Sequence, residues 1–379
     1  INRAVDQLAK LQDFELLPGV AGAISRLNKS GYRSVVVTNQ PVIARGDCTV
    51  RELEQIHCKM ETLLGKEGAY IDRLYYCPHH PDAGFDGEVK ELKIVCACRK
   101  PATGMFKLAK EELNADLDNS WMVGDSTTDV LAAHDAGVRS ILLETGNAGL
   151  DEKYSVIPNY ICPDLSTAVE FILDKHPRLL AQCKVFGASL NAGDVVFVGG
   201  LSRTGKSTFA HVLQEALQKR ELKSHILSVD GWLKATDQRG VNVIERYDMK
   251  ALADFVSALE NRKDVIEVQL PIYSKTNPGF RREVQLNIAP GDILIIEGTI
   301  ALHLWEALGA KATHTYYITL DEGLRKERVI AEYVLRGKSL EEARQIYLAR
   351  QNDEQPFIDA MRNKANHIID LERETIDLS

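Results

Sequence analysis

The stretch GLSRTGKS, from Gly200 to Ser207, has the residue types and spacing that bind the phosphates of a nucleotide. Its glycines let backbone N–H groups turn inward around phosphate oxygens, and its lysine can bridge the β- and γ-phosphates. The serine hydroxyl is a ligand for Mg²⁺. The loop follows the apolar run VVFVG and precedes the helical pattern STFAHVLQEAL, as this chemistry requires. The residues predicted to bind ATP and Mg²⁺ are Gly200, Gly205, Lys206, Ser207 and Thr208.

Three segments downstream of this loop favour a kinase over other nucleotide-hydrolysing enzymes. Asp230 ends an expected second strand, where a carboxylate could accept the proton of an attacking hydroxyl. Glu297 ends the apolar run ILII and is expected to hold Mg²⁺ through its water shell. Arg325, Arg328 and Arg336 lie along an expected helix and the turn after it. A lid that carries these arginines could neutralise the charge that develops on the transferred phosphoryl group.

Four potential metal ligands flank one loop in the first half of the chain. Cys77 and His79 form a C-x-H pair, and Cys96 and Cys98 form a C-x-C pair. Three thiolates and one imidazole are a ligand set for tetrahedral zinc, and four protein ligands leave no open coordination position. The sequence therefore predicts a structural Zn²⁺ site that fixes the shape of the loop between residues 78 and 95.

Other polar residues around this loop could bind a phosphate ester. Thr38 ends the apolar run SVVV, with Asn39 directly after it, and its hydroxyl can donate to a phosphoryl oxygen. Lys100 can neutralise the charge of a phosphate and of a nucleophile. Asp125 follows the run SWMVG and can hold Mg²⁺. Strand-end threonines and aspartates often cap helices, but the set in this order indicates phosphatase chemistry.

The elements that would position these residues are parallel sheets, because apolar runs alternate with helical patterns along the chain. The expected strands of the first half are 34–38, 120–124 and 139–143, and its expected helices are 18–28, 105–114 and 165–175. The pattern restarts with a strand at 194–198. The sequence therefore predicts an α/β protein with two parallel-sheet domains.

A chain of 379 residues is longer than a single hydrophobic core usually grows, so two domains are expected. We place the first domain at 1–175 and the second at 191–379. The segment 176–190 contains His176, Pro177 and a short polar stretch, so it is interpreted as a linker.

Composition restricts the partners of this protein. A net charge of −8 argues against a general nucleic-acid binder, so small-molecule substrates are expected and nucleic acid is not. Seven cysteines in a chain of this length do not indicate a disulfide scaffold. Apolar runs fall short of the roughly 20 residues needed to span a bilayer. We expect a cytoplasmic location without a membrane partner, and the sequence leaves the oligomeric state open.

Over residues 1–172 the chain resembles the heptose bisphosphate and histidinol phosphate phosphatases of the haloacid dehalogenase superfamily. The pieces that carry this resemblance are DFELLPGV, VVVTNQ, IARG, YYCPHHP, CACRKPATGM and VGDSTTD. The resemblance implies a haloacid dehalogenase-like fold, hydrolysis of a sugar phosphate, a zinc-stabilised specificity loop and Mg²⁺ on Asp125. The residues that it implies near the substrate are Asn39, Arg45, Arg99 and Lys100.

The chain departs from this family at two places. The family's Asp-x-Asp-Gly-Thr motif, which holds the nucleophile and the general acid, lies immediately before a pair like Ile1-Asn2. We expect either that a segment upstream of Ile1 supplies the nucleophile, or that this half is an inactive binding module. Pro41-Val42 stands where the family usually has a small residue and glycine, which is expected to alter the substrate loop.

Over residues 193–370 the chain resembles the uridine kinase and phosphoribulokinase group of P-loop kinases. Beyond the phosphate-binding loop, the matching pieces are VDGW, RYD, LPIY, IIEG and the arginine-rich stretch that ends at Arg336. The resemblance implies a P-loop NTPase fold, ATP as donor and a small hydroxyl compound as acceptor. It also implies that Asp230 is the base and that Tyr273 lies in the substrate pocket.

Two positions depart from this kinase group. Gly231-Trp232 replaces the usual second acid beside the base, and Ser274 follows Tyr273 where the group has aspartate. These positions shape the acceptor pocket, so the identity of the acceptor stays open.

Together these features favour a bifunctional enzyme that phosphorylates a sugar, nucleoside or polyol and dephosphorylates a sugar phosphate. One alternative is a polynucleotide kinase-phosphatase, which joins the same two superfamilies in this order and shares the TNQ and RKP-x-TGM wording. The zinc ligands, the IIEG and PIY segments and the lack of a basic half oppose it. The other alternative is a kinase whose N-terminal half only binds a ligand or partner.

Overall fold

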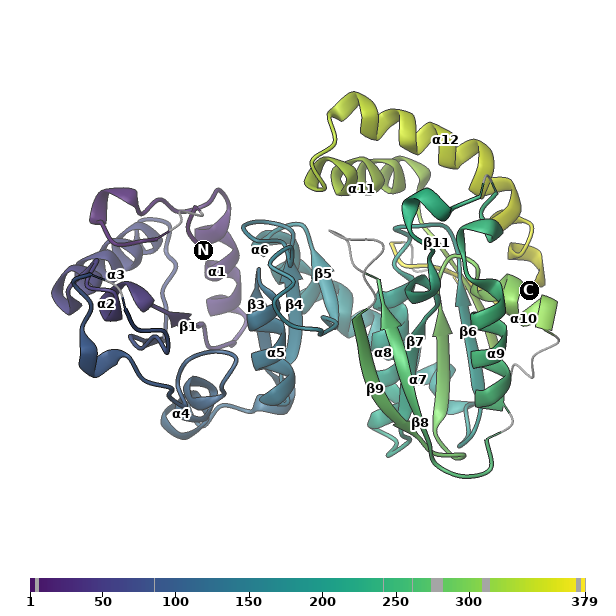
Figure 1. Cartoon of the computed structure of the whole chain (residues 1–379), viewed down its shortest axis with the longest axis horizontal. Helices are drawn as coiled ribbons and strands as arrows, with labels where there is room; N and C mark the ends of the chain where they lie inside the picture. The colour runs from purple at the N-terminus through teal and green to yellow at the C-terminus, as the bar shows by residue number, and fades with distance from the viewer. Residues whose placement is uncertain are drawn as a thin grey trace. The chain divides into compact units, whose positions relative to one another are not determined.

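The computed structural model describes the chain except for residues 4–6, 85, 241, 261, 274–281, 309–313, 373–375 and 379. Ser274, one of the departures named above, therefore lies outside the described residues. The chain folds into two compact units, Ile1–Lys175 and His176–Ser379, and each contains parallel strands with helices packed on them (Figure 1). The predicted α/β class is confirmed.

The segment expected to be a linker is helical. Helix α7 (His176–Ala188) packs against helix α8 (Lys206–Gln218) and belongs to the second unit. Phe186 of α7 contacts Phe209 of α8, with ring centroids 6.1 Å apart. The prediction of a linker is wrong because Pro177 was read as a break, although proline is tolerated in the first turn of a helix.

The strands of the first unit form two separate parallel sheets. One sheet pairs β1 (Val35–Asn39) with β2 (Arg73–Cys77), and the other has the order β3 (Trp121–Gly124), β4 (Arg139–Leu143), β5 (Tyr160–Cys162). The helices are α1 (Val20–Lys29), α2 (Pro41–Ala44), α3 (Val50–Gly65), α4 (Gly104–Leu113), α5 (Thr127–Asp135) and α6 (Leu165–Glu170). A π-helical turn at Phe171–Lys175 follows α6. The three strands predicted in this half are therefore present, each within one residue of its expected bounds.

Helix α3 shows how the local sequence sets these elements. Thr49 accepts a hydrogen bond from the backbone N–H of Glu52, and the Glu52 carboxylate accepts one from the backbone N–H of Thr49. This capping box fixes where the helix begins. Ile56, Met60 and Leu64 recur every four residues, so they lie on one face and pack into the core shared with α1.

The second unit is built on a sheet with the strand order β13-β12-β11-β6-β10-β7. Its strands are β6 (Val195–Gly199), β7 (Ser224–Ser228), β10 (Ile293–Glu297), β11 (His314–Thr319), β12 (His367–Asp370) and β13 (Ile376–Leu378), with only β13 antiparallel to its neighbour. Every residue of β6 and β10 is buried, because these strands lie in the interior of a sheet that helices cover. A separate antiparallel hairpin pairs β8 (Ile266–Ile272) with β9 (Arg282–Ile288).

The second unit also contains several helices, of which α8 and α10 (Ala301–Leu308) pack on this sheet. Besides α7, α8 and α10, they are α9 (Met249–Glu260), α11 (Glu322–Leu335) and α12 (Leu340–Asp359). Helices α11 and α12 lie side by side (Figure 1), joined by a short turn at Arg336–Ser339. Within the described part of the chain, no helix has both the length and the apolar character needed to cross a bilayer.

Candidate active sites

The phosphate-binding loop connects the carboxyl end of β6 to the first turn of α8, as the sequence predicts. Gly200 has a φ of +138°, and a Cβ there would lie 2.3 Å from the carbonyl oxygen of Ile318, so only glycine fits. Gly205 has a φ of +100° and precedes the helix. Thr208 lies in the first turn of α8. The loop therefore presents backbone N–H groups and a helix N-terminus to one point, which is an anion-binding arrangement.

Lys206 is buried at this point and lies among carboxylates. Its Nζ donates to the carbonyl oxygen of Leu201 at 2.7 Å. Burial lowers the pKa of Lys206, while Glu297 and Asp230 act in the opposite direction. Ser207 Oγ donates to Glu297 Oε2 at 3.2 Å, so the two expected Mg²⁺ ligands lie next to each other. Burial, followed by the charge of Asp230, raises the pKa of Glu297.

Asp230 lies in a short 3₁₀ turn, Val229–Trp232, directly after β7. Its Oδ1 accepts a hydrogen bond from the hydroxyl of Tyr247 at 3.2 Å. Tyr247 is 4% exposed, and burial together with Asp230 raises its pKa well above the ordinary value, so the hydroxyl stays protonated. The sequence offers Tyr247 only as part of the RYD piece, because the contact joins segments that are 17 residues apart.

The glycine that replaces the second acid of the kinase group has a steric reason. A Cβ at Gly231 would lie 2.0 Å from the carbonyl oxygen of Pro271 in β8. The hairpin therefore approaches the turn that carries Asp230 more closely than a larger residue would allow.

The three predicted lid arginines have different surroundings. Arg336 Nη1 lies 3.4 Å from the hydroxyl of Tyr273, and its guanidinium pairs with Glu332, which also binds Arg203 of the phosphate-binding loop at 2.5 Å. Arg336 and Tyr273 are thus connected to the loop. The salt-bridge partners of the other two arginines lie elsewhere: Arg325 pairs with Glu322 at 2.6 Å and Arg328 with Glu372 at 2.8 Å.

Helix α12 adds residues that the sequence analysis did not select. Arg350 Nη1 donates to the hydroxyl of Ser202 in the phosphate-binding loop at 3.4 Å. Glu354 is 5% exposed and forms an ion pair with Arg246, which also pairs with Asp353. The only local signal in the sequence is the i, i+4 spacing of an arginine and a glutamate on a helix, which is common on solvated helix faces.

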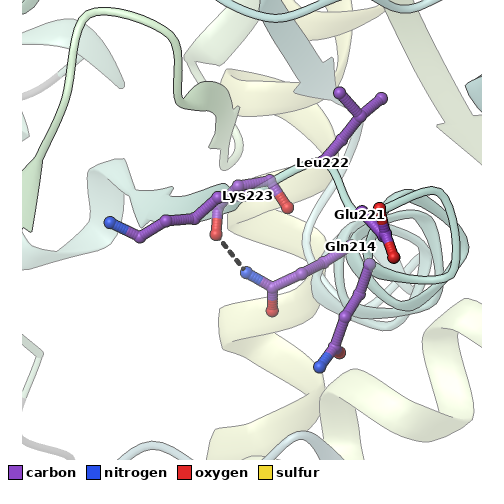
Figure 2. Close-up of a pocket in the computed structure, with 6 residues that line it drawn as sticks. Gln214, Glu221, Leu222 and Lys223 are labelled. Atoms are coloured by element: carbon purple, nitrogen blue, oxygen red, sulfur yellow. Dashed lines mark hydrogen bonds between the residues drawn. The ribbon is translucent and has the colours of Figure 1, made fainter.

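A polar groove of about 420 Å³ lies at the opposite end of the same sheet. It lies beside the last turns of α8 and the start of β7, and Figure 2 shows Gln214 donating to a backbone carbonyl there. Because β7 is parallel to its neighbour β10, this groove lies at the amino ends of the strands, whereas Asp230 and the phosphate-binding loop lie at the carboxyl ends. The groove is therefore separate from the candidate kinase site.

In the first unit, the four predicted zinc ligands come together. Their ligand atoms all lie within 4.8 Å of one another, and the three Sγ–Sγ separations are 3.5, 3.3 and 3.2 Å. His79 Nδ1 lies 3.6 Å from Cys77 Sγ and 3.4 Å from Cys98 Sγ. With bonds of about 2.3 Å to sulfur and 2.0 Å to nitrogen, a tetrahedral zinc ion would separate its ligands by about 3.5–3.8 Å. The arrangement therefore fits zinc, and the sulfurs are too far apart for disulfides.

The two predicted substrate arginines lie beside this cluster. Arg99 Nη1 donates to the carbonyl oxygen of His79 at 3.0 Å, and Arg45 Nη2 lies 3.4 Å from Nε2 of His80. Burial, together with the charges of Arg99 and Arg45, lowers the pKa of His80. The loop held by the four ligands therefore carries or contacts both guanidinium groups.

Lys100 connects strand β1 to helix α5. Its Nζ binds Asp129 Oδ1 at 2.6 Å and the carbonyl oxygen of Val37 at 2.8 Å. Asn39 holds the backbone of Lys100 with two hydrogen bonds, of 2.9 and 3.0 Å. Burial alone would raise the pKa of Asp129, but Lys100 and then Ser126 hold it below its ordinary value.

Thr38 and Asp125 lie at the ends of strands, as predicted. Thr38 Oγ1 accepts a hydrogen bond from Gln40 Nε2 at 3.2 Å, and Asp125 Oδ2 accepts one from the backbone N–H of Asn147 at 2.7 Å. Strand-end residues from both sheets are thus available to a phosphate ester and a cation.

Different families of known proteins match the two units of the chain. The HAD-hydrolase-like family matches residues 97–168, and the Phosphoribulokinase / Uridine kinase family matches residues 195–376. The D-glycero-beta-D-manno-heptose-1,7-bisphosphate 7-phosphatase of Escherichia coli K12 is 37% identical over 166 residues, which cover 44% of this chain and 78% of that protein. Its counterpart from Haemophilus ducreyi is 41% identical over 141 residues, covering 37% and 75%.

Solved structures resemble each unit separately. A D,D-heptose 1,7-bisphosphate phosphatase from B. bronchiseptica, complexed with magnesium and phosphate, is 34% identical with a TM-score of 0.40, covering 45% of this chain and 92% of its own. A possible uridine kinase from Bacillus stearothermophilus is 20% identical with a TM-score of 0.35, covering 51% and 98%.

The sequence matches and the sites define a phosphotransferase that carries a phosphatase domain. The chain belongs, in its first unit, to the haloacid dehalogenase-like family of the heptose bisphosphate phosphatases and, in its second, to the phosphoribulokinase and uridine kinase family. Both resemblances identified in the sequence are confirmed.

Proposed function

We propose that this protein is a bifunctional enzyme, in which an ATP-dependent kinase of a small hydroxyl compound is joined to a Mg²⁺-dependent sugar-phosphate phosphatase. One observation carries the kinase activity. The strands β6, β10 and β7 are neighbours, and their carboxyl ends bring together the phosphate-binding loop with Lys206, then Glu297, then Asp230. Ligands of open parallel sheets bind at this edge.

The kinase residues divide the work of phosphoryl transfer. Lys206 would contact the β- and γ-phosphates of ATP, and Ser207 with Glu297 would hold Mg²⁺, which offsets phosphate charge when bound. Asp230 would take the proton of the acceptor hydroxyl as that oxygen attacks phosphorus. The Tyr247 hydroxyl, which donates to Asp230, would fix the orientation of this carboxylate.

The phosphatase residues support the hydrolysis of a sugar phosphate. The relatives that are 37% and 41% identical are heptose bisphosphate phosphatases, so we propose a phosphorylated sugar as the substrate class. Lys100 and Thr38 would bind the phosphate, and Asp125 would hold Mg²⁺. A structural Zn²⁺ held by three thiolates and an imidazole would keep the loop with Arg99 in place.

The nucleophile of the phosphatase would come from a segment upstream of Ile1. In the described chain, β1 pairs only with β2 and β3 only with β4, so each has an edge without a strand partner. Val37 of β1 packs against the cluster that contains Met122 of β3, which brings the two edges near each other. We propose that a strand carrying an aspartate fits between them, beside Lys100.

A coupled assay of ATP consumption over sugars, nucleosides and polyols tests the kinase, with Lys206→Ala as the variant. We expect one acceptor class to stimulate ATP consumption, and the variant to lose about 100-fold or more in rate while its fold persists. Lys184→Ala, a change outside the site, is the matched control. Acceptor-dependent turnover that survives in Lys206→Ala would refute the assignment of the phosphate-binding loop.

A further inference from the structure

The guanidinium of Arg350 is held at the phosphate-binding loop rather than in solvent. Arg350 lies on α12, and its side chain is 26% exposed. Its Nη1 donates to the hydroxyl of Ser202, the third residue of the loop, at 3.4 Å. Loop and helix are 148 residues apart in the sequence, so tertiary structure alone brings them together.

The carboxylate nearest to Arg350 is shared with another arginine. Nε of Arg350 lies 3.6 Å from Oε1 of Glu354, while Arg246 forms a shorter ion pair with the same oxygen. Burial lowers the pKa of Lys206, and the charge of Glu354 is among those that oppose this shift, so this part of α12 lies within electrostatic reach of the lysine that would contact the β- and γ-phosphates. The neutral hydroxyl of Ser202 is a weak partner for a guanidinium, whereas a phosphate oxygen is a strong one.

Arg350 and Arg336, a lid arginine that the sequence predicts, both lie against the ring of Tyr333. The guanidinium of Arg350 lies 5.3 Å from the centroid of the Tyr333 ring, and that of Arg336 lies 5.6 Å from the same centroid. Arg336 is tied to the loop through Glu332, which also binds Arg203. Cation–π contacts of this kind restrict the planes of both guanidinium groups. Two oriented guanidinium groups therefore lie against one ring: Arg350 contacts the loop directly, and Arg336, which follows α11, is connected to it through Glu332.

We propose that Arg350 is a phosphate-binding residue of the kinase site, which contacts the γ-phosphate of ATP. This inference rests on the proposed kinase function. Arginine suits the role because its planar fork can bind two phosphate oxygens at once, and it stays protonated at all working pH values. The γ-phosphate is the group expected beside Ser202 and Lys206, because the loop and its lysine cradle the β- and γ-phosphates.

Nucleotide binding tests this assignment without knowledge of the acceptor. Calorimetric titration with ADP and with a non-hydrolysable ATP analogue compares the wild type with Arg350→Met and Arg350→Lys. In Arg350→Met, we expect about 10- to 100-fold weaker binding of the triphosphate, as for a lost charged hydrogen bond, and little change for ADP. Arg350→Lys should recover part of the difference, since it keeps the charge but not the fork.

Two controls separate the possible causes. Arg344→Met changes an arginine on the same helix whose side chain is 55% exposed and lies 4.0 Å from Glu341, so both nucleotides should bind as in the wild type. Lys206→Ala should weaken both nucleotides. Equal losses for ADP and the ATP analogue in Arg350→Met, or no loss for either, would overturn the role of Arg350. Unchanged binding of both nucleotides to Lys206→Ala would instead refute the proposed kinase.

Discussion

Strands β1 and β6 have similar sequences, VVVTN and VVFVG, and each leads into a segment that we propose to bind phosphate, yet their surroundings differ. All five residues of β6 are buried, because β10 and β11 flank this strand and helices cover the sheet. All five residues of β1 are half-buried, and β1 pairs only with β2 in the described chain. A valine-rich strand with one unpaired edge leaves backbone N–H and C=O groups exposed, and native proteins normally cover or pair such an edge.

The two sites are assembled by different means. In the second unit, backbone topology does the work, since three adjacent strands end at the same edge and bring their residues together. In the first unit, side chains make the connection, chiefly through Lys100. This residue joins Val37 of β1 to Asp129 of helix α5, which packs on the other sheet. The kinase site should therefore work with the residues described, whereas the phosphatase site should need one more strand.

The largest expected effect concerns the additional strand that the phosphatase site should need. We expect the 379-residue chain to show no phosphatase turnover, and a form extended upstream of Ile1 by its natural segment to show Mg²⁺-dependent hydrolysis of a sugar phosphate. The reason is that Lys100 and Asp125 can bind a phosphate and a cation but do not supply the covalent acceptor. Phosphate release from heptose and other sugar phosphates is the measurement.

Two results would contradict this prediction. Hydrolysis by the 379-residue chain would show that its own residues suffice, and an upstream segment without aspartates would leave the first unit as a binding module. The control is the extended form with its first upstream aspartate changed to asparagine, which should bind the sugar phosphate without hydrolysing it.

The next largest effect is expected for Asp230→Asn, which should reduce the rate of the kinase site. Loss of a general base typically reduces the rate by about 10²- to 10⁴-fold. Affinity for ATP should hardly change, because the carboxylate serves the acceptor hydroxyl. Steady-state kinetics with the acceptor and calorimetry with ATP measure the two effects, and Asp254→Asn on the exposed part of α9 is the control. A parallel collapse of ATP affinity would make Asp230 a metal ligand instead.

Removing zinc should affect the first unit alone. Wild-type protein is expected to bind about one equivalent of Zn²⁺. The double change Cys96→Ser, Cys98→Ser should release the ion, because it removes two of the four ligands. The loop that carries Arg99 should then become accessible to protease, while kinase turnover stays within about twofold, since structural zinc stabilises only the part that it closes. Elemental analysis and limited proteolysis are the measurements.

The matched control for the zinc prediction is Cys58→Ser, because Cys58 is exposed and lies outside the cluster. Freshly purified wild-type protein without zinc would refute the site. Loss of zinc from Cys58→Ser would show that the metal is held elsewhere.

Sequence reasoning worked best where short range determines structure. The loop from Gly200 to Ser207 and the four zinc ligands are local patterns, and the structure brings each set together. The local pattern is misleading at α7, because proline is tolerated in the first turn of a helix, and it does not reveal Tyr247 or Arg350. These two residues contact segments that are distant in the sequence, so nothing in their own sequence neighbourhood distinguishes them from a core tyrosine or a surface arginine.

The smallest expected effect concerns the ion pair of Lys100 with Asp129, which helps to connect β1 to α5 in the first unit. Burial would raise the pKa of Asp129, but the charge and hydrogen bond of Lys100 outweigh this effect. The pKa therefore lies below its ordinary value of 3.8. A depressed carboxyl pKa contributes stability that is fully present above the ordinary pKa and is lost as the pH falls through the folded-state value. Asp129→Asn should therefore lower the free energy of unfolding by roughly 1.5–3 kcal/mol at pH 7, as for a charged hydrogen bond. The difference in unfolding free energy between the wild type and Asp129→Asn should narrow only below about pH 4. Urea unfolding at several pH values measures this, with the exposed Asp13→Asn as the control. A difference in unfolding free energy that stays constant down to pH 3 would show that the charge of Asp129 does not stabilise the connection.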